Sequence, residues 1–172
     1  MKRNLITALM VLVCFLLQCT VFHALAFNGI IPNLMIVLTA SIGVMGGRKR
    51  GLLTGFFSGL LLDIFFGSTI GFFSLIYMYI GYINGCFRKI FYPEDIKLPL
   101  ALIAASDLTG SLLTYFLLFL LRSRFAFGFY FTHIILPEIV YTMGVTLILY
   151  PLILKIDGRM AAKEQRSAKK FV

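Results

Sequence analysis

The sequence predicts an all-α integral membrane protein, a bundle of about six transmembrane helices. Hydrophobic residues make up 60% of the 172 residues and charged residues only 13%, whereas soluble domains carry about 25% charged residues. The Lys and Arg residues stand in short clusters between long apolar runs, not on the single basic face that binding to nucleic acid would need. Lipid is therefore the expected solvent for most of the chain, and no nucleic acid partner is expected.

Six apolar segments are suited to cross a bilayer. The first follows Lys2 and Arg3, and its length of roughly 33 Å exceeds a hydrocarbon core of about 30 Å. Because it ends in Ala24-Leu25-Ala26, a cleaved signal peptide is the alternative. An aromatic stretch before the sixth segment is expected to lie along the membrane surface. We expect helices at residues 5–26, 31–46, 51–66, 70–87, 98–121 and 134–154, and a basic cytoplasmic tail at 155–172.

The basic clusters predict the orientation of these helices. With the N-terminus in the cytoplasm, fourteen of the sixteen Lys and Arg residues lie inside and only Arg122 and Arg124 lie outside, as the positive-inside rule requires. An odd number of spans would split the clusters across the membrane. We therefore expect a multi-pass protein of the inner membrane with both termini in the cytoplasm. The clusters between helices that set this topology are Arg48, Lys49, Arg50, Arg88 and Lys89.

The basic tail is expected to be attracted to anionic lipids, by about 1 kcal/mol per charge near the membrane surface. Docking of a cytoplasmic protein on the tail is the alternative.

A stripe of small residues marks the third predicted helix. Gly51, Gly55 and Gly59 recur at every fourth position, so they lie on one face and allow another helix backbone to approach closely. Gly81 and Gly85 repeat the spacing on the fourth helix. Packing inside the chain, for instance between these two helices, and contact with a helix of a partner are both open.

Three acidic residues lie inside predicted spans, namely Asp63, Asp107 and Glu138. A charge at the centre of a bilayer costs about 2.5–3.5 kcal/mol on insertion scales, so such residues pair, take up a proton or face the protein interior. One hypothesis is a shared binding or proton-relay site. The alternative is that each carboxyl is protonated or bonds to a neighbour, the candidates being Ser58, Ser106, Thr109 and Thr142, with Arg122 or Arg124 for Glu138.

Signals of catalysis or of a bound metal are absent from the sequence. Neither His23 nor His133 has the spacing of a metal-binding motif, and no nucleophile motif occurs. Cys14, Cys19 and Cys86 lie in or beside apolar runs without a CxxC pattern. We therefore expect neither an enzyme nor a cofactor.

Taken in order along the chain, these features resemble the rod shape-determining protein MreD family of bacteria. The resemblance covers essentially the whole chain, and its most specific part runs from Pro32 to Gly85. The matching elements are the basic start of the first span, Pro32-Asn33-Leu34, Arg48-Lys49-Arg50, the series Gly51, Gly55, Gly59 and Asp63, then Gly67, Gly71, and Gly81-Tyr82-x-x-Gly85.

The resemblance implies a non-enzymatic membrane scaffold that binds MreC and helps to control cell shape and lateral peptidoglycan synthesis. It also implies a larger complex with MreB, a SEDS-type glycosyltransferase and a class B penicillin-binding protein. The implied fold is similar to the substrate-binding subunits of energy-coupling-factor transporters.

The alternative function is a small-molecule-binding membrane subunit of such a transporter. The first helix of that kind of subunit should carry paired alanines four residues apart. Ala8, Ala24 and Ala26 do not have this spacing, which favours the scaffold.

Overall fold

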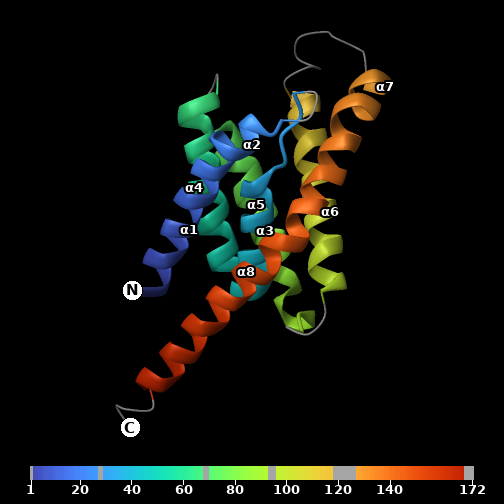
Figure 1. The fold of residues 1–172 in the computed structure, drawn as a ribbon. Helices are drawn as coiled ribbons and strands as arrows, with labels where there is room; N and C mark the ends of the chain where they lie inside the picture. The colour runs from blue at the N-terminus through green and yellow to red at the C-terminus, as the bar shows by residue number, and fades with distance from the viewer. Residues whose placement is uncertain (1, 27–28, 68–69, 93–95, 118–126, 169–172) are drawn as a thin grey trace.

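The computed structural model describes residues 2–26, 29–67, 70–92, 96–117 and 127–168, and these form helices with no strand among them (Figure 1). The prediction of an all-α fold with six main helices is confirmed. These helices are α1 (Lys2–Cys19), α3 (Leu34–Gly46), α4 (Arg48–Phe66), α5 (Phe72–Cys86), α6 (Lys97–Tyr115) and α8 (Leu136–Ala168). The shorter elements are α2 (Val21–Ala24), the 3₁₀-helix η1 (Phe87–Ile90), α7 (Phe127–Tyr130) and the π-helix η3 (Phe131–Ile135).

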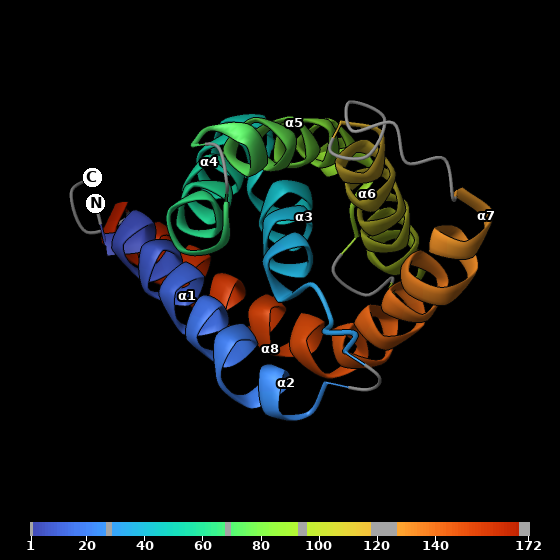
Figure 2. The same ribbon diagram turned by 90° about the horizontal axis from the view of Figure 1, so that it is seen from above.

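Helix α3 occupies the centre of the bundle. Figure 2 shows it surrounded by α4, α5, α6 and α8, with α1 on the outside beside α4. Every residue from Leu34 to Met45 is buried, as expected for a helix that is apolar on all sides. Its first turn is capped by Asn33, whose side chain accepts a hydrogen bond of 3.3 Å from the backbone N–H of Ile36.

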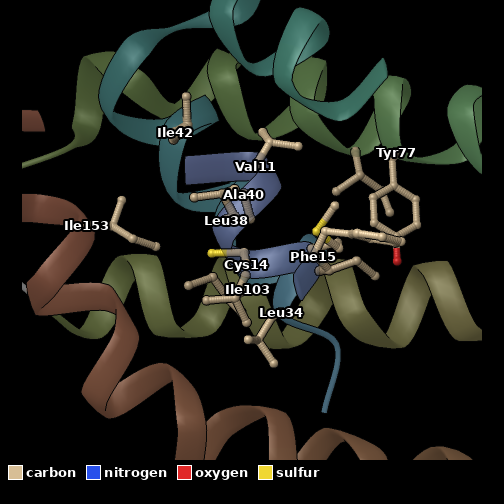
Figure 3. Close-up of a cluster of buried hydrophobic side chains, with 14 of the residues drawn as sticks. Val11, Cys14, Phe15, Leu34, Leu38, Ala40, Ile42, Tyr77, Ile103 and Ile153 are labelled. Carbon is tan, nitrogen blue, oxygen red and sulfur yellow. The ribbon is translucent and has the colours of Figure 1, made fainter. Parts of the chain in front are cut away.

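The hydrophobic core forms around this central helix (Figure 3). Phe15 from α1, Ile103 from α6 and Ile153 from α8 all pack into one cluster with the side chains of α3. Each of the three is at most 5% exposed. The core is therefore built from helices at both ends of the sequence, which makes the bundle a single packed unit.

Among the described residues, three helices are long and apolar enough to span a membrane, namely Arg3–Ala24, Lys97–Tyr115 and Gly128–Ala162. The first joins α1 and α2 and corresponds to the predicted span 5–26. Helix α3 is apolar but shorter, and α4 begins at Arg48, inside the basic cluster. Residues 118–121 of the predicted fifth span lie outside the described residues.

The last helix differs most from expectation. Residues 127–131 belong to the aromatic stretch that was expected outside the sixth helix, but they are helical and continue through η3 into α8. The π-helix ends two residues before Pro137, which has no N–H to donate to the carbonyl of His133. Helix α8 then continues beyond Leu154 to Ala168. Most of the basic tail is thus an extension of the last helix, visible at the lower end of Figure 1.

Candidate functional site

The glycine stripe of α4 lies against α5 of the same chain. A Cβ atom added at Gly51, Gly55 or Gly59 would overlap a backbone carbonyl of α5, at Gly81, Tyr77 and Phe73 respectively. These three carbonyl groups lie four residues apart, and they follow one another down the sequence of α5 as the glycines go up the sequence of α4. The two helices therefore run antiparallel with their backbones in contact. No side chain larger than hydrogen fits at these positions without separating the helices.

The close contact continues to the end of the helix pair. A Cβ atom on Gly85 would lie 2.5 Å from the Cα of Arg48, at the start of α4. The glycines of both helices therefore serve the α4–α5 interface inside the chain. Packing inside the chain is one of the two uses that the sequence left open for the stripe.

Helix α3 joins the same interface through a residue that sequence reasoning missed. A Cβ atom on Gly43 would lie 2.8 Å from the carbonyl oxygen of Gly81 and 3.1 Å from the Cβ of Asn84. A signal was present, because Thr39, Gly43 and Gly47 are small residues four positions apart. Helices α3, α4 and α5 thus form one interlocked unit.

Asp63 ends the stripe and caps the next helix. Its carboxyl accepts hydrogen bonds from the backbone N–H groups of Gly71 (3.0 Å), Phe73 (2.8 Å) and Ser74 (2.9 Å), and from the Ser74 hydroxyl (2.7 Å). Gly71 has a φ of +100° and no side chain for this task. A carboxylate on α4 therefore satisfies the free donors at the start of α5. The sequence-based candidate Ser58 is not its partner.

Asn33, directly before α3, forms hydrogen bonds that link α3, α5 and α8. Its side-chain oxygen accepts a 2.8 Å hydrogen bond from the Tyr77 hydroxyl of α5, and its backbone N–H donates to the Thr142 hydroxyl of α8 at 3.1 Å. Pro32, buried directly before it, fixes φ where the chain enters the bundle. The Pro32-Asn33 pair thus sets the position of α3 relative to α5 and α8.

Asp107 and Glu138 lie beside this junction and interact electrostatically with each other and with Tyr77. Glu138 accepts a 3.3 Å hydrogen bond from Ser111. Asp107 is fully buried next to Thr142, yet neither of its carboxyl oxygens has a partner in hydrogen-bond geometry within the described part of the chain. The structure therefore brings two of the three intramembrane carboxyls together and engages Asp63 elsewhere. Arg122 and Arg124 lie outside the described residues.

The basic residues between the helices, which predict the topology, gather at one end of the bundle. The Arg48 guanidinium lies 5.8 Å from the centre of the Tyr82 ring, and the Arg88 side chain lies over Gly47. Lys49 and Lys89 are exposed. Because α4 begins where α5 ends, these clusters, distant in sequence, share one end of the α4–α5 pair.

Asp157 forms ion pairs with two arginines at the same end of the bundle. Its carboxyl accepts from Arg3 of α1 at 3.2 Å and from Arg50 of α4 at 3.1 Å, and Arg50 also donates to the Thr7 hydroxyl at 3.1 Å. Sequence reasoning missed Asp157, although an acidic residue inside a basic tail was a signal. It ties the extension of α8 to the first turns of α1 and α4.

A family model described as rod shape-determining protein MreD matches residues 1–156. This chain belongs to the MreD family. No curated protein and no solved structure matches the chain. The match covers α1 to α6 in full and α8 as far as Ile156, the residue before Asp157.

Membership of the MreD family assigns the chain a role in rod-shape determination. Because the described part of the chain holds three helices suited to span a bilayer, the chain is a membrane protein. The Pro32 to Gly85 segment that carries the resemblance to MreD coincides with α3, α4 and α5. Its motif residues are therefore those that hold the interlocked unit together: glycines at the helix contacts, Asp63 at a helix cap and Pro32 at the entry to α3.

Proposed function

We propose that this MreD-family protein is a non-enzymatic membrane scaffold that binds MreC and helps to control cell shape and lateral peptidoglycan synthesis. The observation that supports the proposal is that small residues lie at the contacts inside the bundle, whereas large apolar side chains lie exposed on its outside. The small residues and caps are used internally, while the outer faces of α5 and α8 carry large apolar side chains that are more than half exposed, among them Leu75, Tyr79, Ile83, Val140, Leu147 and Ile148.

Such faces suit contact with other membrane helices, because connections between the helices are short and offer little surface outside the bilayer. The interlocked α3–α4–α5 unit would hold these faces in a fixed relation to one another. The proposal includes a larger complex with MreB, a SEDS-type glycosyltransferase and a class B penicillin-binding protein. It places the protein in the inner membrane with both termini in the cytoplasm.

The test is site-specific photo-crosslinking in native membranes. A photoreactive amino acid is placed at Tyr79 on α5 or Ile148 on α8, with Leu9 on the exposed side of α1 as the matched control. We expect an adduct with MreC from Tyr79 or Ile148 and none from Leu9. Absence of an MreC adduct from both test positions, in samples where the protein is present at normal levels, would contradict the proposal.

A second candidate is the small-molecule-binding subunit of an energy-coupling-factor-type transporter. It is favoured by one observation, the fully buried Asp107 whose carboxyl oxygens lack a partner among the described residues. Affinity purification of the tagged chain from solubilised membranes separates the two functions. Recovery of MreC or a wall-synthesis enzyme supports the scaffold, whereas recovery of ATPase and coupling subunits supports the transporter.

A further inference from the structure

A groove runs between α1 and α4 on the outside of the bundle. The helices touch at both ends: Arg50 of α4 donates to Thr7 of α1, and the Phe15 ring of α1 lies 5.0 Å from the Phe65 ring and 6.2 Å from that of Phe66. Between these contacts the helices leave a groove of about 320 Å³. These contacts mark the two ends of the groove.

The side chains that line the groove are mainly apolar, and the polar ones gather toward the end where Arg50 lies. Leu12 of α1 and Leu53, Phe57 and Ile64 of α4 line it, and each is about half exposed or more. From Arg50 to Ile64 the helix rises by roughly 21 Å. This length matches one leaflet of a bilayer, since half of the hydrocarbon core is about 15 Å and the headgroup region adds to it.

The polar end of the groove favours an anion. Arg50 lines the groove there and shares the Asp157 carboxyl with Arg3, so two arginines face one carboxyl. Lys49 is exposed in the same turn of α4, which has no acidic residue and no side-chain cap. With two arginines to one carboxyl and Lys49 nearby, this end of the groove keeps a net positive charge, which attracts an anion such as a phosphate.

We propose that this groove binds an anionic phospholipid, with one acyl chain between α1 and α4 and the phosphate beside Arg50. The lipid belongs to the leaflet on the side of the N-terminus. Its binding does not depend on the proposed scaffold function, because it is measured on the purified chain alone. It adds a specific lipid site to the general attraction that basic segments have for anionic membranes.

The test uses delipidated full-length protein in detergent, mixed with phosphatidylglycerol or phosphatidylcholine of the same acyl chains and examined by native mass spectrometry. We expect phosphatidylglycerol to be retained several-fold more. Arg50→Gln should lower this preference about fivefold, which corresponds to about 1 kcal/mol for one basic group. Equal retention of both lipids by the unaltered protein would overturn the proposal.

Two further comparisons separate lipid binding from damage to the fold. Asp157→Asn removes the same ion pair as Arg50→Gln but keeps the positive charge, so the preference for phosphatidylglycerol should persist. Ala8→Trp fills the groove from its lining, whereas Leu9→Trp adds the same ring at the adjacent exposed position outside it. Loss of the lipid in Ala8→Trp but not in Leu9→Trp is expected, and equal retention in both would place the lipid elsewhere.

Discussion

The Asp63 carboxyl on α4 accepts two hydrogen bonds from Ser74 on α5, from the hydroxyl at 2.7 Å and from the backbone N–H at 2.9 Å. The two residues lie eleven positions apart on consecutive helices, and both are buried. The last buried position of the glycine stripe thus fixes where the partner helix begins. Glycine contacts set how close α4 and α5 approach, and Asp63 sets their register.

Asp63→Ala should destabilise the protein by about 2–3 kcal/mol, because it leaves buried backbone donors at the start of α5 without an acceptor. The measurement is unfolding in mixed detergent micelles followed by circular dichroism. Ile64→Ala is the matched control, since Ile64 is the next residue but is 60% exposed. Similar losses for the two variants would show that the cap contributes little.

Gly55→Ala should cost about 1–3 kcal/mol, because the new methyl group would overlap the Tyr77 carbonyl and force α4 and α5 apart. Gly55→Leu and Gly59→Leu should disrupt the fold more severely. Gly144→Ala serves as the control, because a Cβ atom there meets nothing within 4 Å and alanine favours a helix. Thermal unfolding in detergent measures the stability of all four variants. An unchanged stability of Gly55→Ala would show that the close contact between α4 and α5 does not limit the size of residue 55.

Asp107→Asn should leave the free energy of unfolding unchanged or raise it by about 1 kcal/mol. It removes a buried carboxyl that has no partner in full hydrogen-bond geometry among the described residues and only the nearby Thr142 hydroxyl to stabilise it. This is the opposite of the result expected for Asp63→Ala. The same unfolding assay compares them. A large loss of stability in Asp107→Asn would indicate that this carboxyl has an essential partner in the folded protein.

Asp157→Ala should release the extension of α8, because it removes the acceptor that Arg3 and Arg50 share. Removing one partner of a buried ion pair generally costs about 3–5 kcal/mol, and less where the groups are partly exposed as here. Limited trypsin digestion should then cleave faster after Lys155 and Arg159. Gly158→Ala, at a neighbouring open position, should digest at the unaltered rate, and equal rates for both variants would contradict the role of Asp157.

Much of the fold could be predicted because apolar length and basic clusters are local signals. The stripe of Gly51, Gly55 and Gly59 indicated a close helix contact, and the spacing of Gly81 and Gly85 indicated the partner helix. The sequence did not reveal that α3 would be the central helix, because its composition resembles that of a helix in lipid. Burial by other helices and burial by lipid select the same apolar residues.

The parts of the site that could not be predicted depend on distances between segments that are remote in sequence. Asn33 bonds to Thr142 over 109 positions, and Arg3 bonds to Asp157 over 154. A shared site for the three carboxyls inside predicted spans was one hypothesis, yet Asp63 caps a helix while Asp107 and Glu138 interact with each other. Depth in the membrane does not specify which way a side chain faces.

The complete burial of α3 has a consequence for how the protein meets membranes of different thickness. Its 13 residues extend about 20 Å, well short of a hydrocarbon core of about 30 Å. A helix of this length exposed to lipid would create a hydrophobic mismatch. Helix α3 is surrounded by other helices, so its length is not matched against the thickness of the bilayer. Adjustment to a thicker or thinner bilayer therefore falls to the tilt of the peripheral helices, while the centre of the molecule keeps its geometry.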